Sequence, residues 1–178
     1  MFRQSVIIAK RMASTEAFEQ HFLKLRKDLK QAMLAKDNVT KNSVRNMISD
    51  IKNMQIELRA KNLIEDEFAI AALYKKLIKQ RNESIADFTK NKRADLAEKE
   101  SQDIAIIKKY LESLPVASEE AIEAKAKELL VSLENIESIK INDIFKQVDI
   151  NKAAEEIKAS PNQIKGSIVK VFKQIVGN

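Results

Sequence analysis

Apolar residues recur along this chain at spacings of three and four positions, with charged and amide residues between them. The first of these stripes consists of Phe18, Phe22, Leu25, Leu29 and Met33. Because an α-helix turns once in about 3.6 residues, this spacing places all of them on one helical face. The stripe therefore predicts a helix that ends near Asp37 and Asn38.

Three more stripes follow before residue 115. The second, for which Thr40 or Asn42 is the expected N-cap, consists of Val44, Met47, Ile48, Ile51, Met54 and Leu58. After an expected turn over residues 62–65, Asp66 and Glu67 favour a new helix start through the helix dipole. That third stripe consists of Phe68, Leu73, Leu77, Ile78, Ile85 and Phe88. The fourth, after an interruption at residues 91–93, consists of Leu96, Ile104, Ile107, Leu111 and Leu114. We expect these stripes to form the core of a helical bundle.

Leu114 and Pro115 mark the clearest boundary, because proline disfavours helix in the residue before it. Ser118 is the expected N-cap of a fifth helix, whose stripe consists of Ile122, Ala126, Leu129 and Leu133. Short helices are predicted near residues 141–148 and 153–157. Ser160 and Pro161 predict the N-cap and first residue of a last helix, whose stripe consists of Ile164, Ile168, Val171, Phe172 and Ile175. The pattern thus predicts an N-terminal domain of helical hairpins or a bundle over residues 13–114, and a C-terminal domain of three or four helices over residues 115–178.

Glycine is scarce, and its scarcity excludes several classes of protein. Gly166 and Gly177 are the only two, so residues 1–165 contain none. Phosphate-binding loops need glycine for positive φ and close approach to the ligand, so no Walker A, dinucleotide-binding or kinase glycine loop precedes Gly166. Two glycines and two prolines also supply too few turn residues for a hairpin-rich β protein. An all-α fold is predicted.

The residue types needed for catalysis are also scarce. Cysteine is absent and His21 is the only histidine, which excludes thiol nucleophiles, disulfides and zinc sites built from Cys and His. We expect His21 to lie on a helix surface rather than in a catalytic triad. No pair of carboxylates is set in an apolar context that would separate two pKa values. The prediction is a non-catalytic protein with no metal, no cofactor, no small-molecule substrate and no membrane span.

The first fifteen residues carry Arg3, Lys10 and Arg11 but no acid, and Phe2, Val6 and Ala9 can form an apolar face opposite them. A basic, acid-free, amphipathic N-terminus is typical of a mitochondrial presequence, and Arg11 fits a cut after Met12. The alternative is an ordinary N-terminus. Removing residues 1–12, with their three cations, lowers the formal net charge from +6 to +3. Local clusters, rather than whole-chain basicity, must therefore support any nucleic-acid partner.

One cluster of cations is dense enough to bind phosphates. Within residues 75–93 only Glu83 and Asp87 oppose seven basic residues: Lys75, Lys76, Lys79, Arg81, Lys90, Lys92 and Arg93. Residues four apart share a helical face, and such a face can neutralise phosphates of a folded RNA. No aromatic stacking platform accompanies the cluster, which argues against reading of single strands. The alternative is a solvated face paired with acids of the next helix, namely Glu98, Glu100 and Asp103.

A smaller set of cations lies on the last predicted helix. It consists of Lys165, Lys170 and Lys173. Gly166 beside them would permit a partner backbone to approach closely. We treat this set as a secondary partner-binding candidate, for which an ordinary solvated face is the favoured alternative.

Several of these stretches resemble one known family. Residues 75–88, KKLIKQRNESIADF, followed by residues 93–100, RADLAEKE, resemble the central signature of the GatB/YqeY family. Met33 with residues 35–37 and 45–47 fits the family's opening helices, and residues 107–111 with Leu114 and Pro115 resemble its Tyr-Leu-Pro joint, here lengthened. Residues 160–170 depart from the glycine-rich ending of bacterial members and resemble fungal mitochondrial members.

The resemblance implies a binding function. In the amidotransferase that converts mischarged Glu-tRNA or Asp-tRNA to the amide form, the similar domain is the tail of the GatB polypeptide and contacts the tRNA body. The chain is therefore expected in the mitochondrial matrix, with tRNA or a tRNA-amidating, translation-related protein as partner. The catalytic parts of that enzyme lie elsewhere, so the label of carbon–nitrogen ligase with glutamine as amido-N-donor applies by resemblance only. The alternatives are a matrix protein-interaction module with no RNA partner, which would use the C-terminal helices, and an unrecognised carboxylate-based enzyme.

Overall fold

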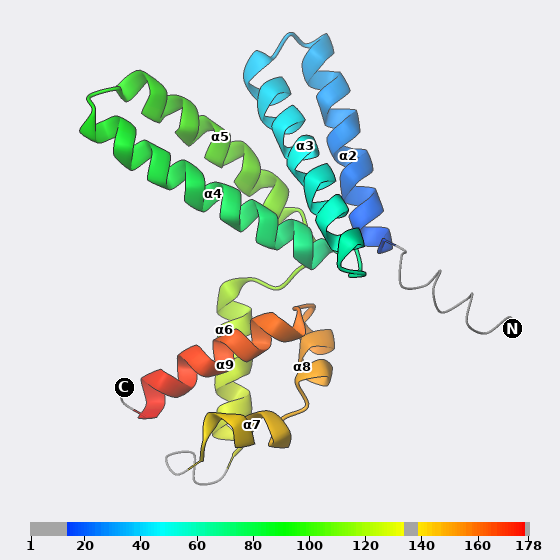
Figure 1. Cartoon of the computed structure of the whole chain (residues 1–178), viewed down its shortest axis with the longest axis vertical. Helices are drawn as coiled ribbons and strands as arrows, with labels where there is room; N and C mark the ends of the chain where they lie inside the picture. Colours follow the sequence, from blue (N-terminus) through cyan, green and yellow to red (C-terminus); the bar gives the residue numbers. More distant parts are fainter. Residues whose placement is uncertain (1–13, 134–138, 177–178) are drawn as a thin grey trace, which may run out of the picture. The chain divides into compact units, whose positions relative to one another are not determined.

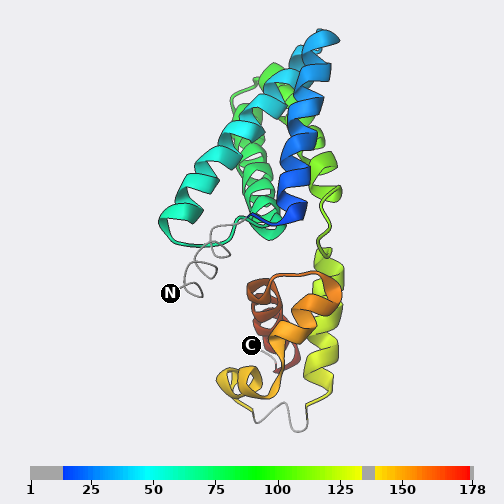
Figure 2. The ribbon, with the colours of Figure 1, turned by 90° about the vertical axis from the view of Figure 1, so that its right-hand side faces the viewer.

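The computed structural model describes residues 14–133 and 139–176 (Figures 1 and 2). These residues form helices joined by turns, with no strand among them, so the all-α prediction is confirmed. The chain passes from one compact unit to a second between Leu114 and Pro115. The expected presequence, residues 1–12, lies outside the described residues.

The first unit consists of two helical hairpins. Their helices are α2 (Glu16–Leu34), α3 (Asn38–Ala60), α4 (Glu67–Lys90) and α5 (Ala94–Glu112). The largest fully buried side chains come from all four helices and include Phe18, Leu25, Met47, Ile51, Ile70, Tyr74 and Ile107. Hydrophobic burial of this kind is the main force that holds amphipathic helices together.

Two of the predicted stripes differ from the buried faces. Met33 is 54% exposed, because it lies in the last turn of α2, beyond the part that α4 and α5 cover. On α4 the buried face consists of Ile70, Ala71, Tyr74 and Leu77. Of the predicted α4 stripe, therefore, only Leu77 is buried, and the others are half-buried. The physical reason is that Ile70 and Tyr74 face the other helices, while the predicted residues lie on the flanks.

Several helices begin at a side-chain cap, whereas α5 and the short helix at Ile141–Gln147 have none. Asp37, rather than Thr40 or Asn42, caps α3, and its Oδ1 accepts hydrogen bonds from the backbone N–H groups of Val39 at 3.1 Å and Thr40 at 3.0 Å. Ser118 caps the fifth helix as predicted, accepting from Ala121 N–H at 3.2 Å. Such a cap contributes about 1 kcal/mol to helix stability.

The helix ends explain how a chain with so little glycine turns. Lys36, Asn62, Lys92 and Lys158 all take the left-handed conformation, with φ between 53° and 57°. At each position the next residue donates its N–H to a carbonyl five residues earlier; the N–H of Arg93, for example, reaches Phe88 O at 2.9 Å. This is the Schellman motif, where glycine is the usual residue. Lysine or asparagine occupies this position here, with the steric strain that a Cβ causes in the left-handed conformation.

His21 is buried, so the prediction of a surface histidine was wrong. Its exposed fraction is 5%, and its Nε2 lies 2.8 Å from the hydroxyl of Tyr74, which is fully buried. Burial, with a smaller effect from Lys24, lowers the pKa of His21 to about 4. Tyr110 packs edge-on to the ring of His21, and its hydroxyl donates a hydrogen bond of 2.8 Å to Asp28 Oδ2. The reason for the burial is that helices α4 and α5 both cover the side of α2 that carries His21.

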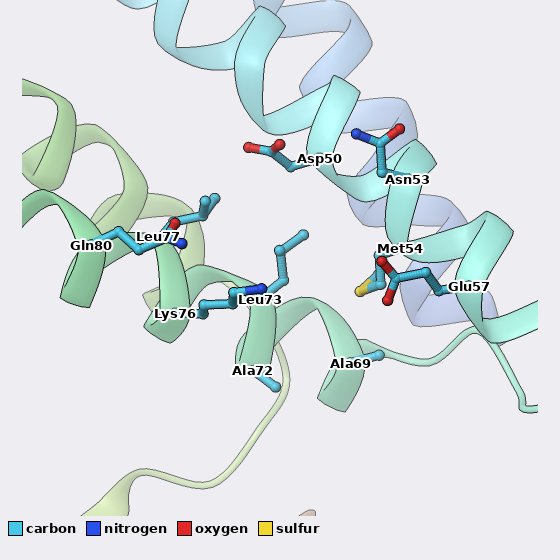
Figure 3. A pocket seen from close by; sticks show the side chains of 10 residues that line it. All are labelled: Asp50, Asn53, Met54, Glu57, Ala69, Ala72, Leu73, Lys76, Leu77 and Gln80. Carbon is cyan, nitrogen blue, oxygen red and sulfur yellow. The ribbon is translucent and has the colours of Figure 1, made fainter.

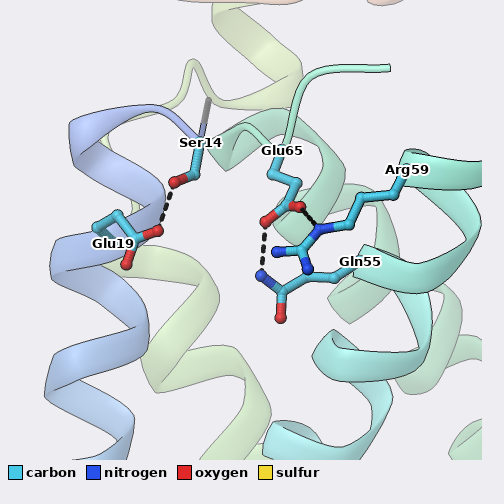
Figure 4. Close-up of polar contacts among 5 residues, drawn as sticks. All are labelled: Ser14, Glu19, Gln55, Arg59 and Glu65. Carbon is cyan, nitrogen blue, oxygen red and sulfur yellow. Dashed lines mark hydrogen bonds and ion pairs between the residues drawn. The ribbon is translucent and has the colours of Figure 1, made fainter. Parts of the chain in front are cut away.

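Glu65 contacts α3 through its buried carboxylate and the start of α2 through its backbone carbonyl. Glu65, 3% exposed, accepts hydrogen bonds from Arg59 and Gln55 (Figure 4). Burial acts to raise the pKa of Glu65, but these hydrogen bonds outweigh burial and lower it. The Glu65 carbonyl also accepts from the N–H of Thr15 at 2.9 Å. The connection between the two hairpins is therefore held to α3 on one side and to the start of α2 on the other.

The second unit is smaller and has its own core. Its helices are α6 (Glu119–Val131), α7 (Ile141–Gln147), α8 (Ile150–Ile157) and α9 (Pro161–Val176). The core includes Ile122, Ala126, Leu130, Ile144, Ile164, Ile168 and Val171. Two predictions here were wrong in detail: Leu130 is fully buried in place of the half-buried Leu129 and Leu133, and Ile175 is 45% exposed. Ser160 and Gln163 form a capping box at α9, with hydrogen bonds of 2.9 and 3.2 Å.

Candidate nucleic-acid interface

The outer half of the α4–α5 hairpin projects beyond the core. Between Leu77 and Ile104 no residue is buried, and Figure 1 shows the turn of this hairpin well separated from α2 and α3. We call residues 79–102 the arm. Lys79, Arg81, Lys90, Lys92 and Arg93 lie on the arm, while Lys75 and Lys76 lie at its base. A projecting hairpin is accessible to a large partner on several sides.

Arg81 faces inward and holds the arm together. Its Nε lies 3.2 Å from Glu100 Oε2 and 3.3 Å from Asp103 Oδ2, both on α5. All three side chains are only about a quarter exposed, at 23–25%. The predicted alternative, pairing with acids of the next helix, therefore describes Arg81. These contacts are ion pairs rather than hydrogen bonds, because Arg81 Nε and Glu100 Oε2 are both buried without a hydrogen-bond partner among the described residues. The inward position leaves Arg81 poorly placed to reach a phosphate.

The lysines of α4 face outward instead. The Lys79 and Lys90 side chains are 79% and 78% exposed. Each lies 3.9 Å from an acid of its own helix, Glu83 and Asp87 respectively. Exposed pairs at this distance contribute little and exchange easily for other partners. Lys76 is also exposed, whereas Lys75 is half-buried.

The tip of the arm carries the last two cations of the predicted cluster. Lys92 is exposed and occupies the left-handed position of the turn. Arg93 donates two hydrogen bonds of 3.1 Å to the carboxylate of Asp95. The hydrogen bonds lower the pKa of Asp95 and raise that of Arg93. Lys92 is therefore the more available of the two for a phosphate.

The secondary candidates on α9 are less favourable. All three lysines are exposed, and Lys170 pairs with Glu123 of α6 at 3.0 Å. A Cβ at Gly166 would meet nothing within 4 Å, so packing within this chain does not require glycine there. Residues 115–178 carry nine lysines and ten acids, against 20 basic and 16 acidic residues in 14–114. The excess of positive charge therefore lies in the first unit.

The described residues form neither a metal site nor a membrane-spanning helix. Among residues 14–133 and 139–176, no group of three His, Asp or Glu side chains is placed to hold a metal ion. Within those ranges no helix has both the length and the apolar character needed to cross a membrane.

Comparison with known proteins gives the family. The Yqey-like protein family matches residues 22–170, which is most of the chain. The chain belongs to this family. The resemblance found in residues 75–100 is thereby confirmed, and the match places α2 to α9 of this Yqey-like protein almost entirely within the family's domain.

Similar proteins from yeasts cover nearly the whole length of this Yqey-like protein. "Altered inheritance of mitochondria protein 41, mitochondrial" of Lachancea thermotolerans is 46% identical over 171 residues, covering 96% of this chain and 90% of the relative. The protein of the same name from Vanderwaltozyma polyspora is 47% identical, covering 93% and 89%. That of Saccharomyces cerevisiae is 42% identical, covering 98% and 99%. The fungal resemblance seen at residues 160–170 agrees with these relatives.

Proposed function

We propose that this Yqey-like protein is a non-catalytic binding protein of the mitochondrial matrix whose partner is tRNA or a tRNA-handling assembly. The names of the yeast relatives support the mitochondrial location, and the acid-free N-terminal segment agrees with it. The family resemblance to the tRNA-contacting tail of an amidotransferase polypeptide supports the partner. Neither a cofactor nor a small-molecule substrate is part of the proposal.

The observation that carries the proposal is an outward row of lysines that runs along α4 into the turn after it, which we call the α4 row. Lys76, Lys79, Lys90 and Lys92 are all exposed and follow α4 from the core to the tip of the arm. Helical spacing puts the first three on one flank. Cations arranged in this way can follow a phosphate backbone without reading bases. Arg81 supports the arm in this proposal, and Lys75 and Arg93 flank the row.

The size of the effect follows from counterion release. Each phosphate contact changes log K by about 0.7–0.9 per tenfold change in salt, so at about 0.15 M salt one contact is worth roughly four- to sixfold in affinity. Losing two contacts therefore costs roughly 15- to 30-fold. Lys76→Glu with Lys79→Glu is the variant that removes two cations from the inner end of the row.

The test is binding of fluorescently labelled mitochondrial tRNA to the mature chain, followed by anisotropy. We expect the Lys76→Glu, Lys79→Glu variant to bind at least tenfold more weakly, with unchanged helicity by circular dichroism. The control is Lys108→Glu with Lys109→Glu, two exposed lysines of α5 with the same change of charge. Equal affinity of the two variants would exclude the α4 row as the site.

A nuclease step separates the proposal from a protein-interaction module with no RNA partner. The tagged chain is recovered from mitochondria with its partners, with and without ribonuclease. Partners that need RNA are lost after treatment. If every partner survives and no tRNA is recovered, the protein-interaction alternative replaces the RNA proposal.

A further inference from the structure

An open groove lies between α3 and α4 in the first unit (Figure 3). Its volume is about 470 Å³. Met54, Leu73 and Leu77 form its apolar floor, and the small side chains of Ala69 and Ala72 leave room along the α4 edge. Nothing in the proposed contact with RNA uses this surface, apart from Lys76 at its rim.

The groove is too open for a small molecule and suits a helix. Of the residues that line it, only Leu77 is buried, while Asn53, Glu57, Ala72 and Gln80 are among the exposed ones. A small-molecule pocket encloses most of its ligand, which this surface does not do. A groove between two helices, with an apolar floor and polar rims, is the usual receptor for an amphipathic helix.

The charges of the rim specify the helix further. Asp50 and Glu57 come from α3 and face Lys76 of α4 across the groove in Figure 3. They are seven residues apart on α3, which is two turns or about 10 Å along the axis. Neither takes part in the ion pairs formed among residues 14–133 and 139–176.

Asp50, on the α3 rim of the groove, already experiences the positive charges of Arg81 and Lys76. It is half-buried, and this burial raises the pKa of its carboxyl, although Arg81 and Lys76 act in the opposite direction. A cation brought to this wall would replace lost hydration with direct charge pairing. Complementary charge of this kind fixes the register and orientation of a partner.

We propose that the groove binds an amphipathic helix of a protein partner, with basic residues at positions i and i+7 paired to Asp50 and Glu57. The apolar face of that helix covers Met54, Leu73 and Leu77. Its opposite flank carries an acid or amide that faces Lys76. Lys79, Lys90 and Lys92 are not among the residues that line the groove, so RNA keeps three of its four proposed lysines when the helix occupies Lys76.

Selection from a library tests the chemistry without assuming a partner. Phage displaying randomised helical peptides are selected on the full chain, and the recovered peptides are synthesised and measured by anisotropy. We expect enrichment of helices with Lys or Arg at i and i+7 beside an apolar face. Enrichment of acidic peptides, or of helices without that spacing, overturns the proposal.

Variants locate the peptide on the protein. Asp50→Asn with Glu57→Gln removes both charges with little change of shape, and Ala72→Trp fills the groove from an exposed position. Both should weaken peptide binding by about tenfold or more, because each removes the complementarity on which binding depends. The control, Glu98→Gln with Glu112→Gln, changes two exposed acids of α5 and should have no effect.

The outcome is distinguishable from failure of the RNA proposal. The groove variants should keep the tRNA affinity of the wild type, whereas Lys79→Glu should lose tRNA affinity and keep the peptide. Peptide binding that is unchanged in both groove variants overturns the helix-binding proposal, whatever happens to RNA.

Discussion

The buried contact between His21 and Tyr74 allows a sharp test of the fold. Tyr74→Phe removes one hydroxyl and leaves the ring in place. Both partners are buried, at 5% and 0% exposed, and the bond is 2.8 Å. The change therefore leaves the Nε2 of His21 in the core without its partner.

The expected cost follows from that burial. Leaving one buried polar group unsatisfied costs about 1–3 kcal/mol, whereas replacing both partners by apolar groups of similar shape is nearly neutral. We expect Tyr74→Phe to lower the free energy of unfolding of the first unit by about 2 kcal/mol. For a unit of this size, each kcal/mol corresponds to about 4–8 °C in Tm. His21→Phe combined with Tyr74→Phe should recover part of the loss.

Urea unfolding, followed by circular dichroism at pH 7.5, measures this cycle. The four proteins are the wild type, the two single variants and the double variant, and the coupling free energy is the difference between the double variant and the sum of the singles. Tyr110→Phe serves as a comparison, because its partner Asp28 is only half-buried and can regain water. A Tyr74→Phe variant as stable as the wild type, or a double variant that shows no coupling, would refute the account of this contact.

Three further predictions concern stability. The pKa of His21 is about 4 in the folded chain, against about 6.5 in the unfolded chain. Because the unfolded chain binds more protons between these values, the free energy of unfolding is undiminished above about pH 6.5 and falls as the pH falls toward 4. Urea titrations should show a smaller decline for His21→Gln than for the wild type over that window, and equal declines would contradict this prediction. Lys92→Gly should raise Tm, because glycine avoids the left-handed strain of about 1 kcal/mol, while Lys92→Ala, which keeps the strain, should not. Arg81→Met should lower the free energy of unfolding by about 1–2 kcal/mol, since Glu100 and Asp103 lose their cation. It should nevertheless weaken tRNA binding less than Lys79→Glu does. A larger loss of tRNA affinity in Arg81→Met than in Lys79→Glu would place Arg81 at the RNA.

The spacing of the apolar residues was enough to predict the helices, because residues three and four positions apart lie on one face of an α-helix. The same period could not decide which residues of each stripe are central. Met33 matches the stripe of α2 but lies beyond the reach of the other hairpin. His21 looked like a surface residue because its partner, Tyr74, is 53 residues away.

The candidate site shows the same limit. Lys79 and Arg81 are neighbours in the cluster, yet helix residues that are two positions apart point in directions about 200° apart. Only the position of α5 decides which of the two side chains faces inward. The groove between α3 and α4 was not predicted, because it exists only where Asp50 and Leu73 come together from different helices. The spacing of Asp50 and Glu57 was the one signal available.

The salt dependence of tRNA binding tests the central claim most directly. The dissociation constant is measured for the wild type and for Lys76→Glu with Lys79→Glu, between about 50 and 200 mM salt. Four exposed lysines predict a slope of about −3 in log K against log salt, and the variant should lose about 1.5 of it. A slope near zero, or the same slope in both proteins, would contradict binding through the α4 row.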